Sequence, residues 1–350
     1  MKKVLPLVNP PIETYQSNSF ILAILLAYEN TACIYYNNYI NLICNNTYNT
    51  FDIKLNFMAT AWEDYRQLGI AEMNLYYLKN ISQNKFVDFI KERIDQDNYI
   101  ISYSVDEYYL SYSQNYMKKH FIHDTYIYGY EEECFCIMAY SDKHLGRHKI
   151  AVQEYLLGMY NQDRNMESVS FCTFRPNHAV KIDIDFPKMR KEFHNYLYPQ
   201  YSATEVSSKA YGIDIYAVLK KSIQNYLKYI DLSEEYPAID IRSFRMLWEH
   251  KAVLRDHIVK ISELMPVDQM ILTQINEVEN KAQKVFRVMI KYTIKKNILY
   301  LSRVVDYLDT IKLMEEEVLS SLLNRFPCSG DNGKGGTSGG GVPETGRISV

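Results

Sequence analysis

The spacing of apolar residues changes in character near residue 204, and this change constrains the fold more than any other feature of the chain. Before it, short runs rich in Tyr, Ile, Val and Phe are separated by polar turns, as in β-strands. These runs occupy 99–105, 120–130, 134–140, 148–152 and 168–174. Residues 84–96 have the apolar spacing of a helix, and VKIDIDF (180–186) alternates as a half-buried strand does.

Beyond residue 204 the apolar spacing is helical and few residues interrupt it. The helical segments are 213–230, 241–265, 267–295 and 297–325, and Pro266 followed by Val-Asp marks a helix start. We therefore predict an α+β fold. A domain over 1–203 has a helix packed on an antiparallel sheet, and an α-helical bundle domain follows over 204–327.

The last 23 residues, 328–350, hold 8 of the 13 glycines in the chain. Such a composition cannot bury a core, so we predict a disordered Gly-rich tail.

The overall composition gives no sign of a nucleic-acid or membrane partner. The chain of 350 residues has 23% charged residues and a net charge of −3. Its strongest apolar run, FILAILLAY (20–28), is too short to span a bilayer and is predicted to be a buried helix. The six cysteines have irregular spacings that do not suggest a disulfide framework. We expect a cytoplasmic protein that binds neither nucleic acid nor a membrane.

The stretch HFIHDTYIYGYEEECFCIMAYSD (120–142) is predicted to be a β-hairpin that turns between Glu132 and Glu133. Residues whose numbers sum to 265 then lie level across the ladder, which places His123 opposite Asp142. Cross-strand neighbours are close enough for a carboxylate to orient an imidazole, as in a nucleophilic hydrolase or transferase. In the alternative interpretation, the His and the Asp are solvent-exposed ends of an ordinary hairpin. His120 is predicted to be a rim residue.

Metal and cofactor motifs are weak or absent. Cys134 and Cys136 share a strand face and His144 and His148 are four apart, but this is not the spacing of a zinc knuckle. Neither the dinucleotide-binding nor the P-loop glycine pattern occurs. We expect no metal and no cofactor.

Several stretches together resemble the butirosin-biosynthesis protein H family. They are VDEYYLSY (105–112), HFIHDTYIYGYEEE (120–133), YQSNSFILAILLAY (15–28) and EHK (249–251). The chain departs from the family pattern at Ser111, where the family has Pro, and at Glu131, where it has Asp.

The resemblance implies a papain-like fold with a nucleophile at the N-terminus of a buried helix, facing a His on the sheet. The named member of the family transfers an aminoacyl group from a carrier-protein thioester to an aminoglycoside amine. His123 matches the family His, and we expect Asp142 to orient it. The family Cys has no counterpart, because the chain reads Gln16-Ser17-Asn18-Ser19 there. Ser17 or Ser19 could attack as a hydroxyl, but both also have the residue type of helix N-caps.

Cys33 lies beyond the end of this predicted helix and is expected in the core. Three functions follow from the resemblance. The first is an acyl or peptidyl transferase of antibiotic-type secondary metabolism, with an acyl- or peptidyl-carrier protein and a small-molecule amine as partners. The second is a catalytically inactive relative that binds such a carrier or another biosynthetic partner. The third is a peptidase-type hydrolase, which the missing Cys disfavours most.

Overall fold

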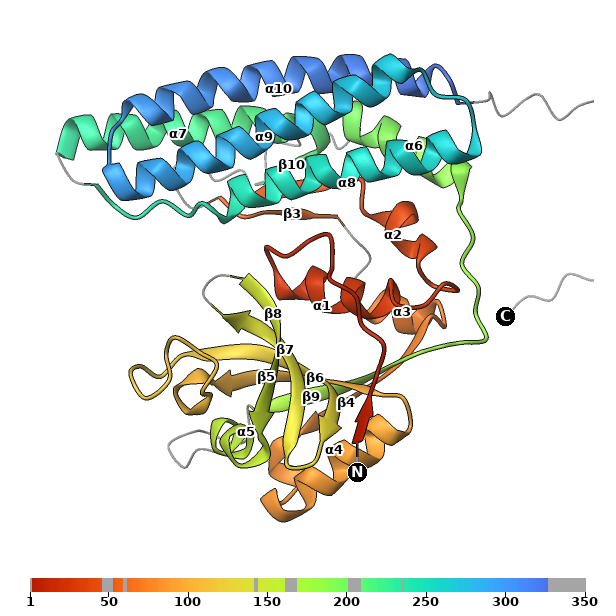
Figure 1. Cartoon of the computed structure of the whole chain (residues 1–350). Coiled ribbons are helices and arrows are strands. Elements are labelled where there is room, and N and C mark those ends of the chain that lie inside the picture. The colour runs from red at the N-terminus through yellow and green to blue at the C-terminus, as the bar shows by residue number, and fades with distance from the viewer. Residues whose placement is uncertain are drawn as a thin grey trace, which may run out of the picture.

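The computed structural model describes residues 2–45, 53–58, 62–141, 144–160, 169–200, 209–233 and 236–326. Within these residues the chain forms a β-sheet part and a layer of long helices, with helix α1 (Gln16–Leu25) between the two (Figure 1). Asp142 and the predicted tail 328–350 lie outside the described residues, as does the predicted boundary at 203–204.

The larger sheet is built from antiparallel pairs of strands in the first half of the chain. The order across it is β4-β9-β5-β6-β7-β8, and β1 also pairs with β6. The strand bounds are β1 Lys2–Val4, β4 Ala71–Tyr77, β5 Tyr99–Asp106, β6 Ile122–Glu131, β7 Cys134–Ser141, β8 His144–Ala151 and β9 Ser170–Pro176. The strands predicted at 99–105, 120–130, 134–140, 148–152 and 168–174 are thus found, with β8 longer than expected.

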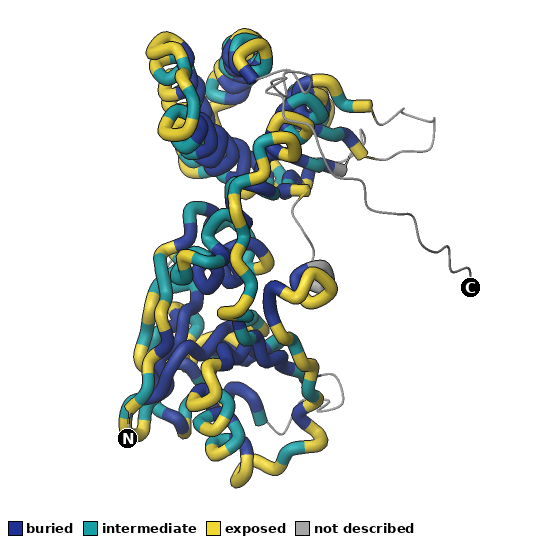
Figure 2. Tube along the Cα trace, turned by 90° about the vertical axis from the view of Figure 1, so that its right-hand side faces the viewer, coloured by how far each residue is buried: buried dark blue, intermediate teal, exposed yellow. Residues whose placement is uncertain are grey.

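Helices cover both faces of this sheet. On one face lie α4 (Gln83–Asp95) and α5 (Val152–Met159), where the Tyr155 hydroxyl contacts Thr125 of β6 at 2.9 Å and Ser102 of β5 at 2.7 Å. On the other face lies α1, where Phe20 packs edge-on against Tyr126 with ring centroids 4.7 Å apart. Residues 18–25 of α1 are all buried, because α1 contacts the sheet on one side and the helical part on the other (Figures 1 and 2).

The predicted hairpin of β6 and β7 forms, with its turn at Glu132 and Glu133. The pairs from Glu131↔Cys134 to Gly129↔Cys136 have the predicted register, but a bulge then places Ile127 opposite Ile137. The predicted register, in which the numbers of paired residues sum to 265, is therefore wrong beyond Gly129. At Gly129 a Cβ atom would lie 2.7 Å from the Lys3 carbonyl of β1, so only glycine allows β1 to approach so closely.

The helical part contains the four long helices predicted from the sequence. They are α7 Ile215–Ser233, α8 Arg242–Leu264, α9 Gln269–Lys295 and α10 Leu299–Leu323. A smaller sheet of order β10-β2-β3 packs beneath them, with β2 Leu42–Asn45, β3 Leu55–Phe57 and β10 Lys209–Tyr211. The core of this part also includes residues from the first half of the chain, such as Leu42, Leu55 and Phe193.

Shorter helical segments complete the described chain. They are α2 Cys33–Asn38, α3 Trp62–Gln67, α6 Phe186–Leu197 and the 3₁₀ turns η1 Leu78–Asn80, η2 Glu107–Tyr109 and η3 Gly212–Asp214. None of the helices in the described ranges is long and apolar enough to cross a membrane.

The strand predicted at 180–186 is not formed. Residues 177–185 connect the β-sheet part to α6 as an irregular segment (Figure 1), and Asp185 caps α6 by accepting the Lys188 N–H at 2.9 Å. Pro187 is the second residue of α6, and a proline in the first turn suits a helix start. The alternation of apolar and charged residues therefore belongs to a connection followed by a helix N-terminus.

The EHK sequence (249–251) lies on α8 and ties the helical part together. Lys251 is fully buried, and its ammonium lies 2.6 Å from the Glu315 carboxylate of α10. His250 is 2.7 Å from the Ile40 carbonyl through Nε2 and 3.0 Å from the Lys251 ammonium through Nδ1. Glu249 accepts the backbone N–H of Thr14 at 3.0 Å, just ahead of α1. These three residues therefore hold α8 to α10, to residue 40 and to the entry of α1.

Candidate active site

Glu107 lies directly after β5, at a point that a bulge in the strand sets. The register of β5 against β6 shifts between Ser102 and Val105, and Ser104 takes the left-handed conformation with φ of 68°. Bulges bend a strand and redirect the side chains that follow. Beyond this one, Val105 pairs with His123, and Glu107 begins η2 beside it.

The Glu107 carboxylate is buried and accepts hydrogen bonds at both oxygens. Its Oε1 lies 2.8 Å from Nδ1 of His123. Its Oε2 accepts the Ser113 hydroxyl at 2.6 Å and the Asn115 side-chain amide at 2.7 Å. The loop after η2 thus supplies two donors that fix the carboxylate against the imidazole.

These contacts also set the charge of Glu107. Burial alone raises the pKa of the carboxyl, but the hydrogen bonds from His123, Ser113 and Asn115 outweigh it and hold the pKa below its ordinary value. An ionised carboxylate has no proton to donate, so Nδ1 of His123 carries the hydrogen. Nε2 is then the nitrogen that can take a proton, and it has no hydrogen-bond partner among the described residues.

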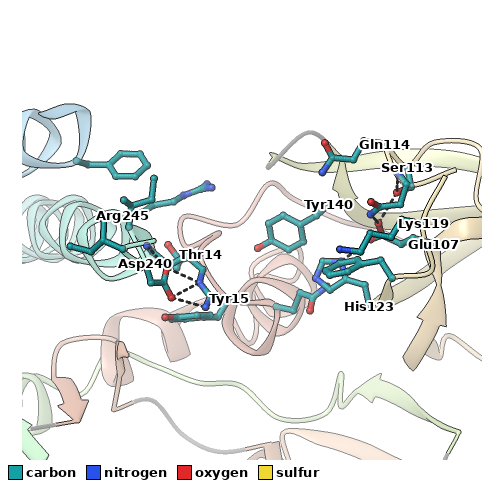
Figure 3. Close-up of a pocket in the computed structure, with 17 residues that line it drawn as sticks. Thr14, Tyr15, Glu107, Ser113, Gln114, Lys119, His123, Tyr140, Asp240 and Arg245 are labelled. Atoms are coloured by element: carbon teal, nitrogen blue, oxygen red, sulfur yellow. Dashed lines mark hydrogen bonds and ion pairs between the residues drawn. The ribbon is translucent and has the colours of Figure 1, made fainter. Parts of the chain in front are cut away.

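His123 and Glu107 face a cavity of about 620 Å³ between the β-sheet part and the helical part. Figure 3 shows the two of them on one side and Asp240 and Arg245 on the other, with Tyr140 between. This volume falls in the range of about 300–1,000 Å³ typical of small-molecule sites. The cavity can therefore hold a ligand beside the imidazole.

The polar part of the far wall of the cavity consists of ion-paired side chains from the helical part, beside the apolar Ile239, Ile241 and Phe286. Arg245 of α8 bonds Glu13 at 2.6 Å and Glu249 at 2.9 Å. Arg242 donates two hydrogen bonds to Asp240, from Nε at 2.9 Å and from Nη2 at 2.6 Å. Because these guanidinium groups already face carboxylates, this part of the wall is polar and has little excess charge.

Tyr140 of β7 fixes the segment ahead of α1 to the sheet. Its hydroxyl donates to the Glu13 carbonyl. Burial raises the pKa of Tyr140 well above its ordinary value, so the phenol stays protonated. Its ring centroid lies 5.7 Å from that of His123. Tyr140 therefore acts as a neutral polar wall beside the imidazole.

The two serines proposed from the sequence lie at different depths in α1. Ser19 is fully buried and its hydroxyl donates to the Gln16 carbonyl at 3.5 Å, whereas Ser17 is exposed and lines a second, smaller cavity. Their interpretation as N-caps is wrong, because α1 begins at Gln16 and Tyr15 occupies the cap position. Gln16 lines both cavities, and as the first helical residue its N–H has no acceptor within the helix.

Cys33, another sequence-based candidate, does not line the large cavity. Cys33 begins the short helix α2, where burial raises the pKa of its thiol, and Lys260 partly offsets this rise. No cysteine of the described chain lines the large cavity. Asp142 lies outside the described residues, so its assignment as the orienting residue stays a prediction. In the part of the chain that the structure describes, no cluster of three His, Cys, Asp or Glu could hold a metal ion.

A second His–carboxylate pair lies next to the first. Asp106 precedes Glu107 and is buried, and it bonds Nδ1 of His120 at 2.7 Å. His120 stacks on the Tyr108 ring with centroids 4.3 Å apart, and its side chain is 57% exposed. His120 does not line the cavity, and this pair holds the end of β5 to the residues that lead into β6.

Sequence reasoning missed Glu107, although it lies within VDEYYLSY. Glu107 is found by looking for the partner of His123 on β5, which pairs with the other side of β6, rather than on the hairpin partner β7. Consecutive acidic residues at the end of one strand, facing two histidines at the start of the next, suggest two such pairs. The bulge between Ser102 and Val105 could not be read from the sequence, and it decides which carboxylate meets which histidine.

The fold and the site define an α+β protein whose His–carboxylate pair faces a cavity between an antiparallel sheet and a helical layer. No protein-family model and no curated protein matches the chain.

Proposed function

We propose that the protein is an acyltransferase that moves an aminoacyl or peptidyl group from a carrier thioester to an amine, with His123 as general base. The observation that carries this proposal is the buried, ionised Glu107 on Nδ1 of His123, which leaves Nε2 available to take a proton at the cavity. The proposal also includes the papain-like arrangement implied by the resemblance to the butirosin-biosynthesis protein H family. The position of the α1 N-terminus beside a sheet His supports it.

The chemistry proceeds without a covalent enzyme intermediate. The amine nitrogen attacks the thioester carbonyl carbon while Nε2 of His123 takes the amine proton. The C–N bond forms, the C–S bond breaks, and the imidazolium returns the proton to the thiolate that leaves. Glu107 keeps the imidazole in the required tautomer and stabilises the imidazolium.

Two features of the site favour direct attack by the amine over a serine nucleophile. Ser19 is fully buried with its hydroxyl on the Gln16 carbonyl, and Ser17 lines the smaller cavity. The backbone N–H of Gln16 lies at the N-terminus of α1, which is the positive end of the helix dipole. We assign this N–H to the developing oxyanion, because Gln16 lines the large cavity.

The test compares His123→Ala with His120→Ala, since both remove an imidazole from a carboxylate pair of the same kind. Wild-type protein is incubated with a panel of aminoacyl thioesters and amines, and amide product is measured by mass spectrometry. We expect His123→Ala to lower the rate by about 10²–10⁴-fold and His120→Ala to retain it. Equal rates for wild type and His123→Ala would refute the proposal. Absence of turnover in wild type would favour the alternative function, a binding module for a carrier or biosynthetic partner.

A further inference from the structure

The second cavity, on the other side of Gln16 from His123, has a composition unlike the first. It measures about 260 Å³ and is lined by Gln16, Ser17, Phe20, Ile101, Tyr103 and Asp124. This is slightly smaller than whole small-molecule pockets, which begin at about 300 Å³. The cavity is therefore sized for one group of a ligand.

Three of its six lining residues, Phe20, Ile101 and Tyr103, are apolar or aromatic. Phe20 of α1 and Ile101 of β5 are each only 1% exposed and belong to the core of the β-sheet part. The Tyr103 hydroxyl interacts with the Cys172 thiol of β9. What remains for a ligand is the ring, whose face attracts cations.

One carboxylate, Asp124, faces these walls. Its Oδ1 accepts the Ser104 N–H at 3.1 Å, in the bulge of β5, and its carbonyl accepts the Gln16 side-chain amide at 2.7 Å. Within the described ranges, no Lys, Arg or His forms an ion pair with Asp124, and Oδ2 has no hydrogen bond. A half-buried carboxylate beside aromatic rings attracts a cation more strongly than one in open water does.

We propose that this second cavity binds a primary ammonium group carried on a small apolar body, with Asp124 as the counter-ion and Phe20 and Tyr103 as the walls. Charge complementarity selects this occupant, because the carboxylate repels anions and the rings favour an organic cation over a hydrated metal ion. The inference rests on these side chains alone and is independent of the acyl transfer proposed above.

The test uses benzylamine, which is protonated at pH 7, and benzyl alcohol, its neutral counterpart of the same shape. Binding is followed by NMR through the Ile101 δ1-methyl group, which lies in this cavity, with the Ile239 and Ile241 methyl groups reporting on the larger one. We expect benzylamine to shift Ile101 with a Kd of about 1 mM and benzyl alcohol to bind at least about tenfold more weakly.

Asp124→Asn should remove the preference for the amine, because the amide can still accept the Ser104 N–H but has no charge. Tyr103→Leu should weaken benzylamine binding by removing the ring. Glu133→Gln, an equal change of charge at an exposed turn outside both cavities, should leave binding unchanged. Equal binding of the two ligands, persistence of the preference in Asp124→Asn, or no shift at Ile101 would each overturn the proposal. We expect His123→Ala to bind benzylamine as wild type does. Failure of the ammonium-binding proposal is therefore distinguishable from failure of the acyl-transfer proposal.

Discussion

Replacing Glu107 by Gln should change which nitrogen of His123 carries the hydrogen while leaving the fold intact. Oε2 of Glu107 accepts two donors, Ser113 and Asn115, whereas Oε1 meets only Nδ1 of His123. The Gln oxygen therefore takes the position with two donors, and the Gln NH₂ group faces His123. Two N–H groups cannot point at each other, so Nδ1 must give up its hydrogen and Nε2 must gain it.

The size of the effect follows from this geometry. If the imidazole kept its tautomer, one buried donor would lose its acceptor, which costs about 1–3 kcal/mol. Switching the tautomer avoids most of that cost, so the free energy of unfolding should fall by less than about 1 kcal/mol. Activity should fall far more, by roughly 10⁴-fold, as when an amide replaces the orienting carboxylate of a serine-protease triad.

The assay combines ¹⁵N NMR of the His123 ring, which reports the protonated nitrogen, with transfer rates and urea unfolding. Asp106→Asn is the matched control. Two backbone N–H groups bond Oδ1 of Asp106 and His120 bonds Oδ2, so the same switch should occur at a histidine outside the cavity. Its transfer rate should stay near wild type. An unchanged His123 tautomer or a normal rate in Glu107→Gln would refute this reasoning.

Two further predictions concern stability. Because the pKa of Glu107 is lowered below 4.5, its contribution to stability is present above pH 4.5 and is lost as the pH falls through the folded-state pKa. Urea unfolding of wild type between about pH 5 and 3 should therefore show a steeper loss than Glu107→Gln, and parallel curves would contradict the assignment. Lys251→Met leaves the buried Glu315 without its cation and should cost about 3–5 kcal/mol at pH 7. The double variant Lys251→Met/Glu315→Gln, which keeps an acceptor for Tyr216, should recover most of that loss, and no recovery would contradict the pairing.

Periodicity was sufficient to find most of the fold. The long helices beyond residue 210 and the strands β5, β6, β7 and β9 bury regular apolar faces, so their sequences predict them well. Periodicity gave the wrong prediction for the segment 180–186. Its alternation is compatible with a strand, but Asp185 and Pro187 favour a helix start, and no strand of the described chain pairs with it.

The type of most elements could be predicted from the sequence. Which side chains meet across the strands depends on bulges that the sequence does not show. The bulge between Ile127 and Gly129 shifts the register of the β6–β7 hairpin by one residue. The bulge between Ser102 and Val105 brings Glu107 to His123. A single-residue shift redirects every side chain beyond it, so His123 could be predicted as a site residue while its partner could not.

The residues on the far side of the cavity could not be predicted from the sequence for a different reason. Arg245 and Asp240 come more than one hundred residues after His123, and only the packing of α8 against the entry of α1 brings them to the site. Glu249 was recognised in the sequence as part of EHK. Its structural role, which is to hold Thr14 and Arg245, follows from contacts across the two parts of the molecule.

The most direct test of the central claim is the intact-protein mass during reaction with aminoacyl thioesters, in the presence and absence of an acceptor amine. We expect wild type to consume thioester only when the amine is present, with no mass gain on the protein, and His123→Ala to consume none above background. A stable mass gain that Ser17→Ala abolishes would contradict direct transfer, and consumption unaffected by His123→Ala would contradict the site itself.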